Sequence, residues 1–422
     1  MERSFKENRD WEPGEKQISL GDWNEKFGWV EEFQASPDGE KVSAIVNIDE
    51  GEFNICVNGD VYEKTFDKIW NLRFLPDGRT FAFVSEMGEW TVAVDGNPWE
   101  GRFGYLWNPL LSNDHSRIAV AVQQDMKYCM AVDGKVWDEM FETITNTAVS
   151  KDGTVTAAVV QVEGFKETEI KKFKQGCFTA ALNGKTWDSR FVNLWDMSFS
   201  DDNQSLAAEV RTSLYDYTIA VDGTPWDARF SGVWKPEFLP GTKSVVAPCK
   251  SGSGWTLYKD GKPLWENSFT QCWQQQVSSD GKRIAAIVAP SFGKWTVAVD
   301  GEALPVTFES MVTDLTFSPD SKKIAALGKT GESWKIFTDN EVWSSAFDMA
   351  WKPVFSPDSK YIAARVEKNG KQTIVINNKI WPVQSDIVWN PVFSPEGDRV
   401  LIRSIEKDTY FRRVINVANL IM

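Results

Sequence analysis

His115 is the only histidine of the chain, so a Ser-His-Asp, Cys-His or bis-histidine haem site would have to use it. It ends the tetrapeptide of residues 112–115, SNDH, at a position where glycine stands in similar tetrapeptides elsewhere in the chain. The sequence has no GxSxG, HExxH, P-loop or CxxCH motif, and no GxGxxG that opens a helix. We therefore interpret His115 as a turn residue and expect the chain not to be an enzyme.

The five cysteines lie far apart and form no CxxC pair. Most stand inside apolar runs, where cysteine behaves as a small hydrophobic residue. Their odd number argues against a disulfide framework, and separated strand cysteines make a poor cradle for an iron–sulfur cluster. We expect no haem, cluster, metal or other cofactor on this chain. The cysteines are Cys56, Cys129, Cys177, Cys249 and Cys272.

Carboxylates stand directly after a tryptophan near the end of five of the repeats. Hydrolysis by paired acids needs two carboxylates that converge in one cleft, and single acids on outer strands do not supply such a pair. Charged side chains there discourage edge-to-edge pairing of sheets. The formal net charge of -14 makes a nucleic-acid partner unexpected. These acids are Glu100, Asp138, Asp188, Asp227 and Glu266.

The elements that carry these residues follow a repeat. A turn such as that of residues 36–39, SPDG, recurs ten times at intervals of 37 to 40 residues, with one interval of 50. Proline presets φ in this turn, and glycine accepts a positive φ. Each turn is followed by an apolar run, a VDG hairpin signal, and a Trp-Asp/Glu-x-x-Phe segment such as residues 99–103. Four short strands per repeat match one blade of a β-propeller.

We predict an all-β protein, a β-propeller of ten four-stranded antiparallel blades that forms a single domain over residues 1–422. The last repeat, residues 394–422, lacks its tryptophan-bearing outer strand. A strand at about residues 19–28, with Trp23 and Phe27, is expected to complete it beside residues 414–417 and so to close one ring. Two five-bladed rings are the alternative, because propellers usually have about four to eight blades. The absence of a linker in the middle favours one ring.

Two groups of residues are candidates for partner binding. Tryptophans that stand five residues before a turn should open the strand that lines the centre, where they either pack between blades or form an aromatic collar that contacts a partner. The insertion of residues 161–174 is either a solvated hairpin or a basic docking arm for a partner or an anionic lipid surface. The candidates are Trp107, Trp195, Trp234, Trp273, Trp351, Trp389, Lys166, Lys171, Lys172 and Lys174.

The FSPD segments at residues 317–320 and 355–358 resemble the WD40-like repeats of TolB-type propellers. The VDG-x-x-W-[DE]-x-x-F repeats, as at residues 94–103 and 221–230, and the chain length resemble the TmcD family, the tryptophan-rich subunits of the Tmc transmembrane redox complex of sulfate-reducing bacteria. This resemblance implies a cofactor-free, non-catalytic scaffold beside an iron–sulfur subunit, a membrane cytochrome b and a periplasmic multihaem cytochrome c.

The same resemblance implies a cytoplasmic chain, peripheral on the inner face of the membrane and held there only through its partners. The charged N-terminal segment, which has no apolar core of a signal peptide, agrees with this expectation. A function of another class stays open, namely a stand-alone propeller that binds a ligand or glycan, with sugars stacked on the central tryptophans.

Overall fold

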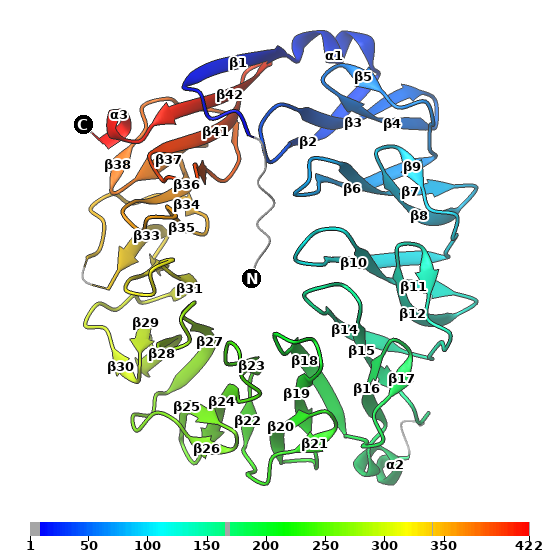
Figure 1. Cartoon of the computed structure of the whole chain (residues 1–422), viewed down its shortest axis with the longest axis vertical. Coiled ribbons are helices and arrows are strands. Elements are labelled where there is room, and N and C mark those ends of the chain that lie inside the picture. Colours follow the sequence, from blue (N-terminus) through cyan, green and yellow to red (C-terminus); the bar gives the residue numbers. More distant parts are fainter. Residues whose placement is uncertain (1–8, 165–168, 340, 422) are drawn as a thin grey trace.

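The computed structural model describes residues 9–164, 169–339 and 341–421, which form one closed ring of ten antiparallel blades (Figure 1). The strands of each blade follow one another from the centre of the ring to its perimeter. We number the blades 1 to 10 from the first innermost strand. The predicted ten-bladed ring is thus confirmed, and the alternative of two smaller rings is wrong.

The innermost strands line the centre of the ring, and the second strands pack beside them. The innermost strands are β2 (Trp29–Ala35), β6 (Lys68–Phe74), β10 (Tyr105–Leu111), β14 (Ile144–Val149), β18 (Asn193–Phe199), β22 (Gly232–Val233) with β23 (Glu237–Phe238), β27 (Gln271–Val277), β31 (Met311–Phe317), β34 (Met349–Ala350) with β35 (Val354–Phe355), and β39 (Ile387–Val388) with β40 (Val392–Phe393). The second strands are β3 (Val42–Asp49), β7 (Thr80–Glu86), β11 (Ile118–Gln124), β15 (Thr156–Gln161), β19 (Leu206–Arg211), β24 (Val245–Ser251), β28 (Ile284–Ser291), β32 (Ile324–Thr330), β36 (Ile362–Lys368) and β41 (Arg399–Glu406).

Third strands and outer strands complete the blades, and three short helices accompany them in the described residues. The outer strands are much shorter except in blade 10, and blade 8 has the single pairing of Phe337 with Val342 in place of an outer strand. The third strands are β4 (Glu52–Val57), β8 (Glu89–Val94), β12 (Lys127–Val132), β16 (Phe178–Leu182), β20 (Tyr217–Val221), β25 (Gly254–Lys259), β29 (Lys294–Val299), β33 (Ser333–Thr338), β37 (Lys371–Ile376) and β42 (Thr409–Asn416). The outer strands are β5 (Asp60–Val61), β9 (Asn97–Pro98), β13 (Lys135–Val136), β17 (Lys185–Thr186), β21 (Thr224–Pro225), β26 (Lys262–Pro263), β30 (Glu302–Ala303), β38 (Lys379–Ile380) and, in blade 10, β1 (Gly14–Ser19). The helices are α1 (Gly21–Lys26), α2 (Ile170–Gln175) and α3 (Ala418–Ile421). None of the helices in the described part of the chain is long and apolar enough to cross a bilayer.

The two ends of the chain close the ring. Strand β1 pairs antiparallel with β42, with Gly14 opposite Val414 and Ser19 opposite Thr409. The predicted closure is therefore confirmed, but its predicted bounds are wrong. Residues 21–26 form α1 rather than a strand, and β1 lies beside residues 409–414 rather than 414–417. Trp23 is buried in this helix, and its indole Nε1 approaches Gly59 of blade 1. It thereby takes the place of the missing outer tryptophan of blade 10.

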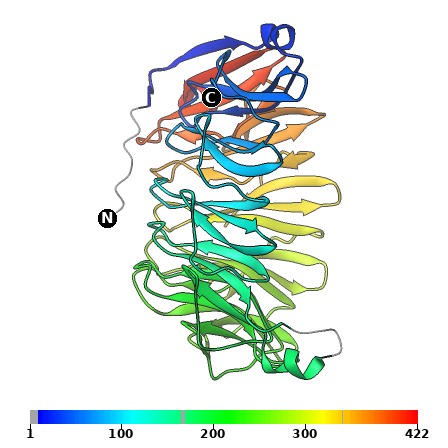
Figure 2. The same ribbon diagram turned by 90° about the vertical axis from the view of Figure 1, so that its right-hand side faces the viewer.

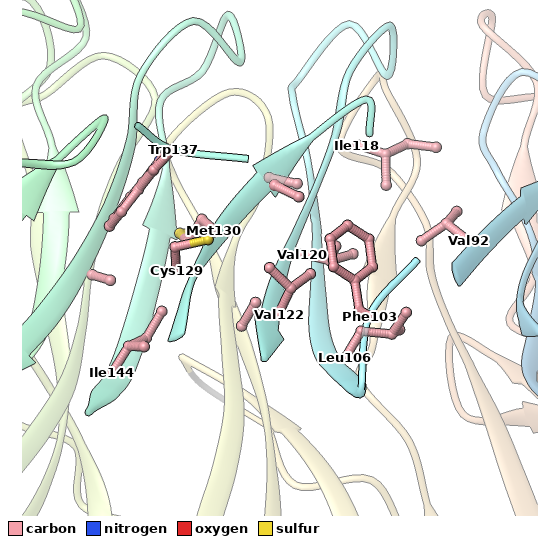
Figure 3. Packing of buried hydrophobic residues seen from close by; sticks show 14 of the residues in the cluster. Val92, Phe103, Leu106, Ile118, Val120, Val122, Cys129, Met130, Trp137 and Ile144 are labelled. Atoms are coloured by element: carbon pink, nitrogen blue, oxygen red, sulfur yellow. The ribbon is translucent and has the colours of Figure 1, made fainter. Parts of the chain in front are cut away.

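The hydrophobic core lies between the blades. Each second strand is apolar at consecutive positions because the two neighbouring blades cover its two faces. The burial of the first six residues of β28 is an example. Figure 3 shows one such cluster, in which Val92 of blade 2, Val120 and Val122 of blade 3, and Ile144 of blade 4 belong to one packed body. The ring therefore has a core that continues from blade to blade.

The outer strands are shorter than the sequence predicts. In blade 2 the predicted strand of residues 99–103 is not formed: β9 covers only Asn97–Pro98, and Phe103 alone returns to pair with Trp90. Between them the chain bulges outward, held by the Thr91 hydroxyl, which donates to the Gly101 carbonyl at 2.7 Å. This bulge lets Trp99 leave its own sheet and cover the glycine of the next blade's hairpin, Gly134.

The contact between an outer tryptophan and the next blade's glycine recurs around the ring. A Cβ atom on the glycine would lie 3.3 to 3.5 Å from the indole or its Cβ in each of these pairs. Glycine is therefore required twice, for the positive φ of the turn and for the close approach of the ring. The pairs are Trp99 with Gly134, Trp137 with Gly184, Trp187 with Gly223, Trp226 with Gly261, and Trp265 with Gly301.

We expect Gly223→Ala to lower the free energy of unfolding by about 1 kcal/mol more than Gly370→Ala. Both glycines have positive φ, 79° and 71°, so both variants bear the backbone cost. Only at Gly223 would the new methyl group press on a neighbour, at 3.3 Å from Trp187, whereas Gly370 has nothing within 4 Å. Urea unfolding of the two variants measures the difference, and equal losses would contradict the role of the blade contact.

The ring has two different faces. On the turn face, which carries the SPDG-type turns, Ser36 Oγ donates to Asp38 Oδ1 at 2.5 Å and accepts the Lys41 amide at 2.9 Å. Neighbouring turns there bind one another, as when the Asn113 amide donates to the Lys151 carbonyl at 2.7 Å. The opposite face, here called the hairpin face, carries the turns between second and third strands, and α2 projects on that side (Figure 2).

Candidate functional site

The structure places the two predicted groups of partner-binding residues far apart in the fold. The six tryptophans all lie in or directly after an innermost strand, at Trp107, Trp195, Trp234, Trp273, Trp351 and Trp389. Lys171, Lys172 and Lys174 belong instead to α2, at the outer edge of the ring (Figure 1). Lys166 lies outside the described residues. The insertion forms this short helix, and Lys172 is held within it by an ion pair with Glu163 at 3.1 Å.

One face of each inner tryptophan packs on a side chain of its own blade. Trp273 stacks on Trp295, with ring centroids 4.9 Å apart and planes at 16°, and Trp234 stacks on Trp255 at 5.5 Å and 12°. The remaining four contact Tyr128, Tyr217, Arg365 and Tyr410. These contacts fix the rings, which are partly buried, while Trp234 keeps 39% of its surface exposed. The geometry therefore combines a packing role with a free aromatic surface.

The residue after each of these tryptophans belongs to a polar ring that the sequence interpretation overlooked. It stands four positions before the first residue of every turn, and we call the set the inner belt. Most innermost strands bulge here, as between Trp70 and Arg73, because an extra residue opposes the second strand. Asn71 adopts a φ of 58° and Gln274 one of 48°, a conformation that short polar side chains tolerate best. The belt comprises Glu32, Asn71, Asn108, Asn146, Asp196, Lys235, Gln274, Asp314, Lys352 and Asn390.

Hydrogen bonds across blade boundaries fix much of the inner belt. Asn108 Nδ2 donates to Thr147 Oγ1 at 2.6 Å, and Asn146 Nδ2 donates to Asp196 Oδ1 at 3.1 Å. The buried Gln275 donates from Nε2 to the Lys235 carbonyl at 2.7 Å. The belt thus joins neighbouring innermost strands and presents its unused polar groups toward the centre.

A cavity of about 520 Å³ opens along this belt between blades 5 and 9. Trp234 and Trp273 supply its aromatic wall, and the amines of Lys235 and Lys352 stand beside it. Its other polar wall consists of Asp196, Glu237, Gln274, Gln275, Gln276 and Asp314. Such a volume suits a small ligand or a side chain of a partner. Aromatic rings, amides and both signs of charge in one hollow suit recognition of a polar surface.

Two acids near the cavity favour their neutral form. Burial raises the pKa of Glu237 to about 7, an effect that the nearby Lys235 amine opposes. Burial also raises the pKa of Glu209, in β19, to about 8, and the neighbouring Asp196 carboxylate adds to the shift. Around neutral pH, Glu209 is therefore mostly a hydrogen-bond donor rather than a charge.

Neither the cysteines nor the histidine line this cavity. All five thiols are buried and unpaired, and burial raises the pKa of Cys129 to about 11 and that of Cys272 to about 12. A protonated, buried thiol is a poor nucleophile and a poor ligand. His115 adopts a φ of 56° in its turn, as predicted for a residue in the place of glycine. Nowhere in the described residues do three or more His, Cys, Asp or Glu side chains gather as a metal site.

Comparison with solved structures shows the fold of this chain. A crystal structure of the eukaryotic initiation factor is 16% identical, with a TM-score of 0.50 over 77% of this chain and 89% of that chain. TolB from Acinetobacter baumannii is 15% identical, with a TM-score of 0.30 over 57% of this chain and 61% of that chain. No protein family profile and no curated protein sequence matches the chain. At these identities the likeness extends to the β-propeller architecture alone.

Proposed function

We propose that this chain is a non-catalytic, cofactor-free scaffold that docks on the cytoplasmic side of a membrane-bound electron-transfer complex, beside an iron–sulfur subunit and a membrane cytochrome b. The observation that carries the scaffold role is the cavity on the inner belt, where Trp234 is exposed between Lys235 and further polar groups. Tryptophan beside charged groups is the composition of a protein-binding hot spot. The repeat resemblance to the TmcD family supports the identity of the complex.

The remaining chemistry of the chain agrees with a scaffold. The thiols are held protonated in the core, and the two acids with raised pKa values stand on different blades, Glu209 in β19 and Glu237 in β23. A hydrolytic pair needs two carboxyls on one bond, and of these two acids only Glu237 lines the cavity. Electron transfer would then be the task of the partner subunits.

We expect Trp234→Ala to reduce binding of the chain to its partner complex by at least tenfold, because truncation of a hot-spot tryptophan costs about 2 kcal/mol or more. Trp70→Ala is the matched control, since Trp70 holds the same position in blade 2 with 36% exposure and does not line the cavity. Pull-down of tagged variants from native membranes, followed by haem and iron analysis, measures the loss. Equal binding by both variants, or a stoichiometric cofactor on the isolated chain, would contradict the proposal.

A stand-alone ligand- or glycan-binding propeller is the second candidate, and the cavity favours it to a lesser degree. Trp234 and Trp273 could stack on a sugar ring while the amides of Gln274 and Gln276 bind its hydroxyl groups. Among the predicted tryptophans, Trp107 does not line this hollow. Glycan-array binding that Trp234→Ala abolishes and Trp107→Ala leaves intact would favour this function over the scaffold.

A further inference from the structure

Large apolar side chains stand almost fully exposed at the tips of the hairpin face, but only on one part of the ring. Met87 is 98% exposed, Phe292 95%, Tyr215 80%, Met126 75% and Ile170 59%. They occupy the connections between second and third strands in blades 2, 7, 5, 3 and 4. The corresponding tips of blades 8, 9, 10 and 1 carry glycine, asparagine and charged residues instead. The exposure is therefore concentrated on one side of one face.

The same part of the hairpin face is basic, although the whole chain is acidic. We call residues 124–127, 169–175, 211–217, 250–254 and 290–294, in blades 3 to 7, the hairpin arc. Its basic residues are Lys127, Lys171, Lys172, Lys174, Arg211, Lys250 and Lys294, and its acidic residues are Asp125, Glu169 and Asp216. The neighbouring tips of blades 1 and 2 are acidic, with Asp49, Glu50, Glu52, Glu86 and Glu89. In blades 3 to 7 apolar tips and positive charge thus coincide, whereas the exposed Met87 of blade 2 stands between Glu86 and Glu89.

The form of this surface fits a lipid bilayer better than a protein partner. A protein interface needs a contiguous, well-packed apolar core, whereas here each apolar side chain stands on its own hairpin between polar neighbours, as Phe292 does between Ser291 and Gly293. A bilayer accepts separate side chains, because the boundary between headgroups and acyl chains adapts to each of them. Tyr215 also projects from a loop that is fixed by its own hydrogen bonds, with Arg211 Nε donating to the Ser213 carbonyl at 3.1 Å.

We infer that the hairpin arc docks directly on an anionic phospholipid surface. Phe292, Tyr215, Met126 and Ile170 enter the boundary between headgroups and acyl chains, and the surrounding lysines contact lipid phosphates. Because the tips of blades 8 to 10 and blade 1 are polar, the ring lies tilted, with blades 3 to 7 toward the bilayer. This contact adds to the association through partner subunits and does not depend on it.

The test uses the full chain and protein-free vesicles, of phosphatidylcholine alone or with an equal part of phosphatidylglycerol. We expect the wild-type chain to sediment with the anionic vesicles and to bind the neutral ones at least tenfold more weakly, with the difference reduced by salt. Phe292→Ser with Tyr215→Ser should weaken anionic binding by about tenfold or more, since two large apolar side chains leave the interface. Lys127→Gln with Lys294→Gln should weaken it similarly.

The matched control is Lys282→Gln with Lys322→Gln, which removes two exposed lysines from the turn face. It should bind vesicles like the wild-type chain, and all variants should keep the wild-type melting temperature because the exchanged side chains are exposed. Equal binding to both kinds of vesicle, or an equal loss in the control, would overturn the inference. The inference would also be overturned if the wild-type chain did not bind protein-free vesicles while the arc variants bound native membranes more weakly than the wild type. That result would assign the arc to a protein partner. If the arc variants lose vesicle binding but still assemble with the partner complex, the proposed scaffold role is unaffected. The two proposals can therefore fail separately.

Discussion

Deletion of residues 1–20 should open the ring and destabilise the protein severely. The deletion removes β1, which leaves the whole length of β42 as an unpaired edge. It also removes Glu15, which binds Arg413, and the buried Leu20. Glu15 is 41% exposed and Arg413 keeps its ion pair with Glu406, so the loss comes mainly from the exposed edge of β42 and from Leu20, whose burial contributes about 1.5 to 3 kcal/mol. We expect a strongly lowered melting temperature and association of copies through β42, measured by calorimetry and light scattering.

The deletion can be controlled in two ways. Removal of residues 1–8 alone leaves β1 in place and should keep the melting temperature and the particle size of the full chain. A synthetic peptide of residues 9–20, added to the deleted chain, should restore both, because it carries β1 and the buried Leu20. A scrambled peptide should not. A deleted chain that melts like the full chain would show that the ring does not depend on its terminal strand.

Glu209→Gln should stabilise the protein at high pH and leave its stability nearly unchanged at low pH. The pKa of Glu209 is about 8 in the folded chain, against the ordinary value of 4.5. The folded state therefore holds a proton that the unfolded state has lost, so the free energy of unfolding falls as pH rises from about 4.5 to 8. The shift corresponds to about 3 to 5 kcal/mol above pH 8, and neutral glutamine avoids this cost. Urea unfolding at pH 4.5 and pH 9 measures it.

Glu266→Gln is the control for this experiment, because Glu266 is an exposed acid on the perimeter. It should change the free energy of unfolding by the same small amount at both pH values. A stabilisation by Glu209→Gln that does not grow with pH would mean that the side chain is charged and compensated in the folded protein.

Local turn chemistry made the blade number predictable. The turn serine binds the aspartate two residues on in seven of the ten turns, as Ser356 Oγ and Asp358 Oδ1 do at 2.6 Å, and this bond needs no distant partner. Apolar residues at consecutive positions of the second strands likewise report burial on both faces. Trp23 also predicted the closure, because it supplies the outer tryptophan that the last repeat lacks. The hairpin glycine of the next blade packs against this tryptophan, whichever end of the chain provides it.

The details that depend on contacts between blades could not be predicted. The sequence extends the outer strand of blade 2 to Phe103, whereas Trp99 turns away to reach Gly134 in the next blade. Helix α1 replaces the expected strand because Trp23 must approach Gly59 from an arm that is already paired along residues 14–19. These deviations follow from neighbours that are distant in sequence.

The inner belt could have been predicted from the position of its residues in the repeat. Its members differ in type, from Glu32 to Lys235 and Asn390, so they form no motif. Their shared property is the place four residues before the turn, where a polar residue stands in every repeat. The raised pKa of Glu209 was even harder to predict, because Glu209 stands between Ala208 and Val210 in a strand that is otherwise apolar. Only the structure shows which of these polar residues line one common cavity.

The pairing of β1 with β42 brings the beginning and the end of the chain to the same sheet, so the order in which the blades are synthesised is not essential to the ring. A circular permutant with the old ends joined by a short linker and new ends cut at the Asn369–Gly370 hairpin tip should fold to the same toroid. In such a molecule the seam that is now held by hydrogen bonds would be covalent, and the joint between β36 and β37 would become the noncovalent one.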